Sequence, residues 1–281
     1  MISIQTNVAS LYGQQNLWAN GNFQQTTIER LTSGYRINSS ADDAAGLAVA
    51  NALRNERTEL TQGVRNANDG VSQLQIIDGG LSNISQILDR LKTLATQAAS
   101  GTFTGDFTAL NNEFTNDLGE IDRQAANIGL NTGGNFAQTL TVYVGGGLGT
   151  NNGAVIGTAA ETINLSNSGV DSSTLGLTSG TVKIDNTTDA TAAIASIAAA
   201  VVSLGQVQGV VGAGINQLNF SIGLAQSQVT NYAADESRIR DADIAAEAAN
   251  LSKAQVLQQA SMAALAQANS TPQSVLSLLR G

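Results

Sequence analysis

The chain contains no histidine and no cysteine among its 281 residues. Without cysteine it has no disulfide framework and no thiolate chemistry. Without histidine it lacks the most common acid–base side chain and the most common metal ligand. A glycine-rich tract at residues 145–157 lacks the Gly-Lys-Ser/Thr ending of a phosphate-binding loop. We therefore expect no enzyme activity, no metal and no cofactor.

Basic residues, aromatic residues and long hydrophobic runs are also scarce. Only 13 residues are basic against 22 acidic ones, and the resulting net charge of −9 argues against nucleic acid as a partner. No run of about 18 consecutive apolar residues is present, so we expect no membrane-spanning segment. The start lacks the cationic and apolar regions of a signal peptide, which indicates either an internal protein or export by another route.

Aromatic side chains make up 4% of the chain, while there are 29 glycines. A thick core is therefore not expected, and Ala, Leu, Ile and Val must supply the buried surface in narrow helix seams.

Charge is almost absent from both ends of the chain. Residues 1–28 carry no charged side chain, and residues 255–281 carry only Arg280. Both ends nevertheless have apolar residues at helical spacing, such as Val8, Leu11 and Trp18 at the front. Because chain ends of soluble proteins usually fray in water, these two ends are predicted to pack on a shared surface.

Hydrophobic periodicity predicts long helices on either side of a different middle region. Apolar residues at three- and four-residue spacing predict one helix over about 42–100, with a capping box at Ser39 or Ser40 and a soft spot at residues 78–80. A shorter helix is predicted over about 106–129. A second long seam runs from Ile194 to Tyr232, with Gln208 as its only polar member, and this polar residue could set the register.

The middle region, about residues 131–186, has period-two runs at residues 139–144, 162–165 and 181–184 among turn-forming residues. We expect a small β-hairpin region there. The predicted fold class is mainly α, a long coiled-coil helix-bundle rod with that hairpin region.

Several segments resemble bacterial flagellin in their amino-acid sequence and in their order along the chain. At the front these are Glu29-Arg-Leu-Thr-Ser-Gly-Tyr-Arg-Ile-Asn38, Ala41-Asp-Asp-Ala-Ala-Gly46 and Arg65-Asn-Ala-Asn-Asp-Gly70. At the back they are Arg238-Ile-Arg-Asp-Ala-Asp243, Leu265-Ala-Gln-Ala-Asn269 and the final segment from Pro272. The resemblance covers roughly residues 1–130 and 190–281.

The resemblance implies a structural subunit that self-assembles into the helical flagellar filament used for motility. It implies a terminal coiled-coil (inner tube) domain of residues 1–40 with 238–281, a rod domain of residues 41–237, and no separate outer domain. The terminal helices are expected to be disordered in the monomer and to order on assembly. The expected partners are other copies of the chain, the flagellar export apparatus, a carboxy-terminal chaperone, and the filament cap and junction proteins.

The residues expected to carry terminal packing share an apolar character and a helical position near one end. They are Val8, Leu11, Trp18, Ile244, Leu251, Leu265, Val275, Leu276 and Leu279.

A further implied partner is the vertebrate innate immune receptor for flagellin. The segment Leu88-Asp-Arg-Leu-Lys-Thr-Leu-Ala-Thr-Gln97 keeps Arg90, Leu94 and Gln97 of the recognised pattern, and Glu113 matches its acidic position. Asp89 and Thr93 depart from that pattern, and the missing carboxylate at Thr93 removes a potential charge-assisted hydrogen bond.

Two other functions are compatible with the predicted helical rods. A flagellar hook–filament junction protein would resemble flagellin at its ends, and another secreted coiled-coil polymer would share only the periodicity. A metalloprotease insert, found in some flagellins, is excluded because the chain has no histidine.

Overall fold

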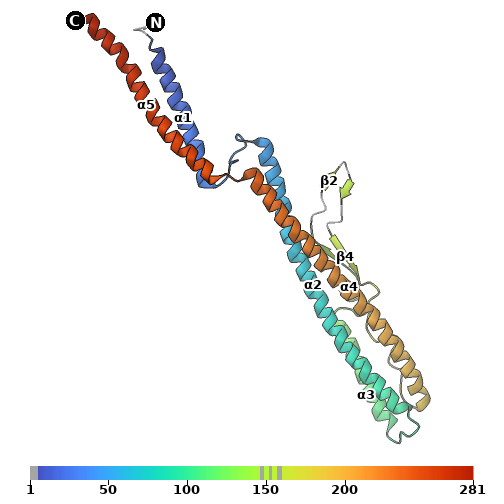
Figure 1. Ribbon diagram of the computed structural model, residues 1–281. Coiled ribbons are helices and arrows are strands. Elements are labelled where there is room, and N and C mark those ends of the chain that lie inside the picture. Colours follow the sequence, from blue (N-terminus) through green and yellow to red (C-terminus); the bar gives the residue numbers. More distant parts are fainter. Residues whose placement is uncertain (1–5, 146–148, 152–153, 157–159, 281) are drawn as a thin grey trace. The chain divides into compact units, whose positions relative to one another are not determined.

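The computed structural model describes residues 6–145, 149–151, 154–156 and 160–280, with side chains at 6–145 and 160–271. Five helices dominate it: α1 (Val8–Ser33), α2 (Ala44–Ala99), α3 (Phe107–Asn127), α4 (Thr187–Arg240) and α5 (Ile244–Arg280) (Figure 1). Strand β1 (Thr139–Tyr143) pairs antiparallel with β4 (Ala160–Asn164), and β2 (Gly149–Asn151) pairs with β3 (Ala154–Ile156). The predicted class, mainly α with a small hairpin region, is confirmed.

The chain forms two compact units. One unit contains residues 1–55 and 231–281, and the other contains residues 56–230. Helices α2 and α4 each contribute residues to both units.

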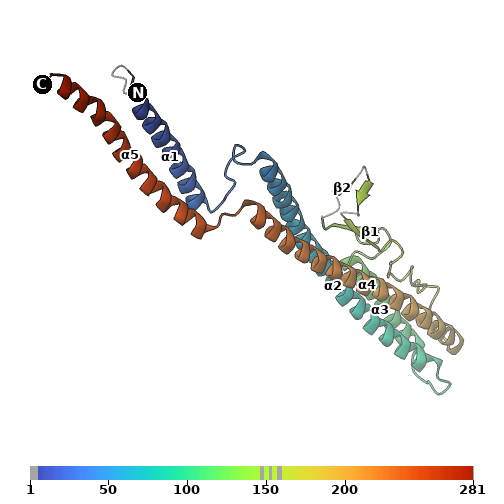
Figure 2. The ribbon, with the colours of Figure 1, turned by 45° about the horizontal axis from the view of Figure 1, so that its top comes forward.

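In the unit of residues 56–230, α2, α3 and α4 lie side by side (Figures 1 and 2). Their facing stripes are buried, and each large aliphatic side chain contributes roughly 1.5–3 kcal/mol on burial. The fully buried residues include Leu74, Leu81, Leu88 and Leu91 of α2, Phe114, Leu118 and Ile121 of α3, and Val211 and Leu218 of α4. These are the three- and four-residue seams that the sequence predicts.

The start of α2 differs from the predicted capping box. The Asp43 carboxylate accepts a hydrogen bond from the Gly46 amide at 2.8 Å, so Asp43 caps the helix that begins at Ala44. Asp42 instead accepts from the Ser39 amide at 2.8 Å, which organises the loop before the helix. The serine cap was wrong because the carboxylates compete better for backbone N–H groups.

The predicted soft spot at residues 78–80 does not interrupt α2, which is continuous from Ala44 to Ala99. A Cβ atom on Gly80 would lie 2.2 Å from the Ile128 side chain. Glycine at this position therefore permits close packing of Ile128 on the helix.

The buried line of α4 is shifted from the predicted seam at every second position. Ile197, Leu204, Val211, Leu218 and Ala225 are buried as predicted. At the alternate positions the buried residue lies one place earlier in the sequence than predicted. Ala193, Ala200, Val207 and Gly214 are buried there, rather than Ile194, Val201, Gln208 and Ile215. Gln208 lies at the edge of this line and does not set its register. The prediction chose the larger apolar residue at three of these places, whereas the buried residue there is the smaller neighbour: Ala193, Ala200 and Gly214.

The β1–β4 hairpin is held on α2 and α4 by three buried glycines. A Cβ atom on Gly63 would lie 1.6 Å from the Val144 carbonyl oxygen, and one on Gly70 would lie 3.0 Å from Val142. A Cβ on Gly214 of α4 would lie 2.9 Å from the Ile163 side chain. The glycines therefore let the hairpin lie directly against the two helices.

Hydrogen bonds hold the same hairpin at its edge. The Tyr143 hydroxyl donates to Glu59 at 2.7 Å, and the Asn66 side chain donates to the Tyr143 carbonyl at 3.0 Å.

The predicted strand at residues 181–184 is wrong. The amides of Thr181 and Val182 both donate to the Thr178 carbonyl, which forms a turn. Ile184 is fully buried, and its amide donates to the Asn111 side chain at 3.1 Å. A helix side chain therefore takes the place of a strand partner.

Candidate assembly surface

Helices α1 and α5 lie side by side in both views (Figures 1 and 2). Small and polar residues make much of their contact. The Asn20 side chain donates to the Ser261 hydroxyl at 2.8 Å, and the Asn7 side chain donates to the Ala268 carbonyl at 2.8 Å. Gly13 lies under Leu265, whose Cδ1 would be 3.0 Å from an added Cβ. The pair is thus closely packed but buries little large apolar surface.

An ion pair also joins α1 and α5. Arg30 of α1 lies 3.4 Å from the Glu247 carboxylate of α5, and Glu247 is 8% exposed. The Asn250 side chain donates to the other Glu247 oxygen at 3.2 Å. The Glu247 side chain is largely removed from water and Arg30 is about one-third exposed, so this ion pair links α1 and α5 at a partly buried position.

The large apolar side chains of the pair mostly face outward. Trp18 is 71% exposed, and Val8, Leu11 and Ile244 are each more than half exposed. Leu251 and Leu265 are half-buried within the subunit. Val275, Leu276 and Leu279 belong to α5 by their backbone, but their side chains lie outside the described residues.

Other exposed apolar residues on the same helices were not predicted, among them Tyr12 at 65% and Val256 at 64% exposure. These residues follow the same three- and four-residue spacing, but the spacing does not show which face of a helix is covered.

The segment that links α1 to α2 pairs with the segment that links α4 to α5. The Arg36 amide donates to the Arg240 carbonyl at 2.7 Å, and the Ala242 amide donates to the Gly34 carbonyl at 2.9 Å. Gly34 ends α1 with a φ of 76°, a conformation that favours glycine. These residues between the helices therefore form a short two-stranded contact.

Two arginines reinforce this contact reciprocally. Arg36 Nη2 donates to the Ile239 carbonyl at 2.8 Å, and Arg240 Nε donates to the Ile37 carbonyl at 3.4 Å. The Arg240 guanidinium also lies 4.1 Å from the centre of the Tyr35 ring. Sequence periodicity gave no signal for these bonds, because backbone carbonyls accept them.

The residues matched to the immune-receptor pattern divide between surface and core. Arg90 Nε donates to Glu113 at 3.1 Å, and this ion pair is exposed. Gln97 is exposed, whereas Leu94 is only 1% exposed and packs in the core. The Thr93 hydroxyl donates to the Asp89 carbonyl of its own helix at 2.9 Å.

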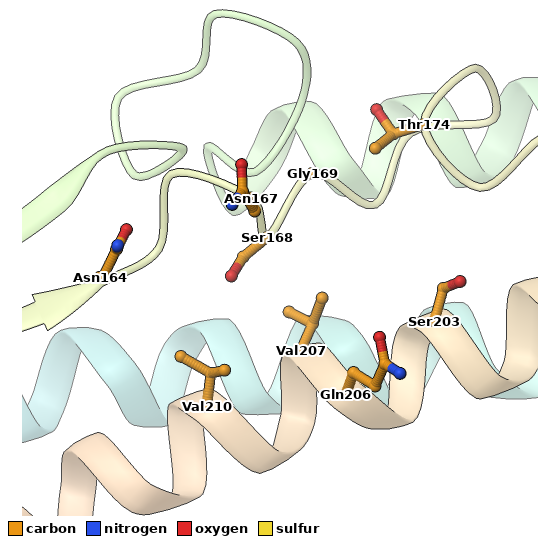
Figure 3. Close-up of a pocket in the computed structure, with 9 residues that line it drawn as sticks. All are labelled: Asn164, Asn167, Ser168, Gly169, Thr174, Ser203, Gln206, Val207 and Val210. Atoms are coloured by element: carbon orange, nitrogen blue, oxygen red, sulfur yellow. The ribbon is translucent and has the colours of Figure 1, made fainter.

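No group of three or more Asp and Glu residues could hold a metal ion among the described residues. A groove of about 380 Å³ lies between the loop after β4 and α4 (Figure 3). Its lining is uncharged: Asn164, Asn167, Ser168, Gly169, Thr174, Ser203, Gln206, Val207 and Val210.

By length and composition, α4 is long and apolar enough to cross a membrane. Its most apolar 18-residue window has a mean hydropathy of 1.8, and 33% of that window is buried. The expectation of no such segment counted only uninterrupted apolar runs, whereas glycine, serine and glutamine interrupt this one.

Comparison with known proteins gives two family matches. Residues 4–141 match the bacterial flagellin N-terminal helical region, and residues 194–279 match the bacterial flagellin C-terminal helical region.

Full-length relatives are also similar. The chain is 36% identical to a flagellin of Halalkalibacterium halodurans, with 99% of both chains covered. It is 32% identical to flagellin FlaB2 of Treponema pallidum, again with 99% of both covered. The crystal structure of Bacillus cereus flagellin is 27% identical, with 61% of this chain and 94% of that chain covered and a TM-score of 0.45.

Proposed function

Because this chain belongs to the bacterial flagellin family and is a structural subunit of the extracellular flagellar filament, we propose that its α1–α5 pair is the surface that polymerises. The single observation that carries this proposal is the outward position of the large apolar side chains on the pair. Trp18 at 71% and Leu11 at 55% exposure would be covered by neighbouring copies.

The driving force is burial of apolar surface between subunits. Burial of apolar area contributes about 25 cal/mol per Å². For several such side chains per subunit, this free energy exceeds the conformational entropy cost of ordering two helices only when many copies pack together. A contact between different faces that does not close into a ring extends into an open helical polymer. Val8, Leu11, Trp18, Ile244, Leu251, Leu265, Val275, Leu276 and Leu279 are the residues assigned to this packing.

We assign residues 1–40 with 238–281 to the inner tube and residues 41–237 to the rod around it. The test is electron microscopy of purified protein seeded with short sheared filaments. The full chain should give long smooth filaments, and a chain without residues 1–30 and 250–281 should give none. Filaments from the truncated chain would contradict the assignment.

A point variant tests the same surface more finely. Trp18→Ser should raise the critical concentration for polymerisation, because it removes a large apolar side chain that neighbouring copies would cover and that is 71% exposed within the subunit. Thr115→Ser, an exposed change on α3, is the matched control. Equal polymerisation of the two variants would contradict the role of Trp18.

We further propose that the chain leaves the cell through the flagellar export apparatus, with a chaperone on its carboxy-terminal segment. This proposal is supported by residues 254–279 of α5, which carry no charge and expose apolar side chains such as Val256 and Met262, since a chaperone would keep such a surface from packing too early. The cap and junction proteins are proposed as partners at the two ends of the polymer. Co-purification of the chaperone with the full chain, but not with a chain ending at residue 249, tests the chaperone contact.

Contact with the innate immune receptor is proposed at the exposed ion pair of Arg90 and Glu113 and at Gln97, with Leu94 supporting the helix from the core. The test is a receptor reporter assay with monomer. We expect the wild-type chain to signal and Arg90→Ala to signal less. Silence of both would contradict the proposal.

A further inference from the structure

An asparagine in the interior of α1 both precedes a glycine and contacts α5. Asn20 is followed directly by Gly21. The Asn20 side-chain amide donates to the Ser261 hydroxyl at 2.8 Å and to the Leu257 carbonyl at 3.5 Å. The nitrogen of this amide is therefore held by α5, on the side where the two helices pack.

A glycine after an asparagine allows the two residues to close a ring. The Gly21 backbone nitrogen can attack Asn20 Cγ, because glycine has no Cβ to hinder the approach and its backbone adopts many conformations. The new N–Cγ bond forms as the Gly21 nitrogen gives its proton to hydroxide. The Cγ–Nδ2 bond then breaks, and the leaving nitrogen takes a proton from water and departs as ammonia. Water opens the resulting succinimide at either carbonyl, which leaves aspartate or isoaspartate in place of asparagine.

The paired state of α1 opposes this reaction. Within α1 the Gly21 amide belongs to the hydrogen-bond ladder of the helix, which holds it away from Asn20 Cγ. The nitrogen that must leave is engaged by Ser261. Ring closure therefore requires α1 to unwind around Gly21 and to separate from α5 there.

Such unwinding is accessible because α1 is a weakly supported helix near a chain end. Its residues 8–28 carry no charged side chain and gain no support from ion pairs, and Gly13 and Gly21 both lower its helix propensity. An added Cβ on Gly21 would meet nothing within 4 Å among the described residues, so side-chain packing does not secure the helix at this point. Terminal segments open more readily than core helices do. We therefore expect ring closure mainly in subunits whose α1 and α5 are unpaired.

The products do not suit the contact between α1 and α5. An ionised aspartate has only acceptor oxygens, so it cannot donate to the Leu257 carbonyl as the amide does. It would also place a negative charge at a partly buried position, and residues 1–28 and 254–279 contain no Lys or Arg to pair with it. Isoaspartate adds its Cβ to the main chain and so disturbs the helical spacing. Either product therefore disfavours pairing of the two helices.

We propose that Asn20 is a site of spontaneous deamidation in the unpaired subunit, and that this reaction withdraws aged subunits from assembly. The first part is a property of the subunit alone. The second part rests on the proposed function of the α1–α5 pair. Assembly protects Asn20, so the polymer retains the amide.

Peptide mass spectrometry of the full chain, aged at mildly alkaline pH, tests the reaction. The tryptic peptide of residues 1–30 also contains Asn7, Asn16 and Asn22, none of which precedes glycine, so each sample carries its own comparison. In the monomer Asn20 should convert several-fold faster than these three residues, and in filaments its conversion should slow several-fold. Conversion of Asn20 at the rate of the other asparagines in the monomer, or at equal rates in monomer and filament, would overturn the proposal.

Gly21→Ala isolates the chemistry from the contact. The added methyl group hinders ring closure, whereas the open space at Gly21 accommodates it in the helix. Conversion of Asn20 in the monomer of this variant should therefore fall several-fold below that of the wild-type chain. An unchanged rate would mean that ring closure with Gly21 is not the route.

Asn20→Asp mimics the product and tests its consequence. This variant should raise the critical concentration for polymerisation several-fold, whereas Asn83→Asp, at an exposed position of α2, should leave it unchanged. Polymerisation of Asn20→Asp at the wild-type concentration would refute the withdrawal of aged subunits. If the wild-type chain forms no filaments at all, the proposed function fails with this second part, while the conversion rates in the monomer still decide the first.

Discussion

Asp171 fixes the loop between β4 and α4 through five hydrogen bonds to its carboxylate. It accepts from the Thr132 amide at 2.9 Å and the Thr132 hydroxyl at 2.5 Å. It also accepts from the Thr174 amide at 2.8 Å, the Thr174 hydroxyl, and the Ser173 hydroxyl at 3.2 Å. Burial alone would raise the pKa of this carboxyl, but the bonds from Thr132 and Thr174 outweigh it and hold the pKa well below its usual range.

Replacement of Asp171 by alanine should therefore destabilise the subunit by about 2–4 kcal/mol at neutral pH, since hydrogen bonds to a charged group contribute about 1.5–3 kcal/mol each and are not additive. The lowered pKa means that this stabilisation is fully present above the pKa of an unfolded aspartate, about 4, and is lost progressively as the pH falls from there through the lower pKa of the folded state. Urea unfolding at pH 7 and at pH 3 measures both effects. A destabilisation of equal size at both pH values would contradict the role of the ionised carboxylate.

The ionised carboxylate of Asp117 is expected to destabilise the fold, in contrast to that of Asp171. Its Oδ2 atom is buried and has no hydrogen-bond partner among the described residues. Burial, and next the charge of Glu113, raise the pKa of Asp117 above its ordinary range, and Arg90 partly opposes them. The ionised form therefore destabilises the fold above its pKa, and this penalty disappears as the pH falls through that pKa.

Asp117→Asn should accordingly raise the melting temperature at pH 7, by a small amount because the side chain is partly solvated. The difference from wild type should vanish in acid, where the aspartate is neutral. Calorimetry across pH 3–7 checks this expectation, with the exposed Asp89→Asn change on α2 as the control. A lower melting temperature for Asp117→Asn at pH 7 would show that the carboxylate is stabilising.

At the scale of single elements, three glycines position the hairpin on α2 and α4. Gly63→Ala would place a methyl group 1.6 Å from the Val144 carbonyl oxygen, a backbone atom that cannot rotate away. We expect the free energy of unfolding to fall by about 2–4 kcal/mol, or the hairpin to be released from α2.

The matched control lies on the same helix. Gly79→Ala meets nothing within 4 Å in the described part of the chain and should stabilise α2 by about 0.5–1 kcal/mol. Chemical denaturation of both variants gives the comparison. Similar free energies of unfolding for the two would mean that the hairpin does not rest on Gly63.

The long helices could be predicted from the sequence, whereas their contacts could not. The extents of α2 and α3 follow within a few residues from three- and four-residue periodicity, although the cap of α2 is Asp43 and not the predicted serine. The choice of Ala200 over Val201 as a buried residue depends on how closely a neighbouring helix approaches, and periodicity carries no information on that distance. The bonds from Arg36 and Arg240 were missed for a related reason, since their acceptors are backbone carbonyls that every residue has.

At the scale of the whole molecule, charge is segregated along the sequence. Residues 1–28 and 190–234 carry no charge, and residues 254–281 carry only Arg280, so the charged residues lie mainly on α2, α3 and the connecting segments. The uncharged parts cover most of α1, most of α4 and the carboxy-terminal two-thirds of α5. A polymer built through these parts would keep most of its charge in water and exclude water mainly from neutral surface.

This segregation predicts how assembly depends on salt. Each subunit has a net charge of −9, so raising sodium chloride from about 20 to 200 mM should lower the critical concentration modestly by screening subunit repulsion. Sulfate at the same ionic strength should lower it further, because it strengthens the burial of apolar surface. Sedimentation of filaments from free subunits measures both effects. A critical concentration that rises steeply with sodium chloride would instead mean that ion pairs hold the subunits together, since screening weakens such pairs.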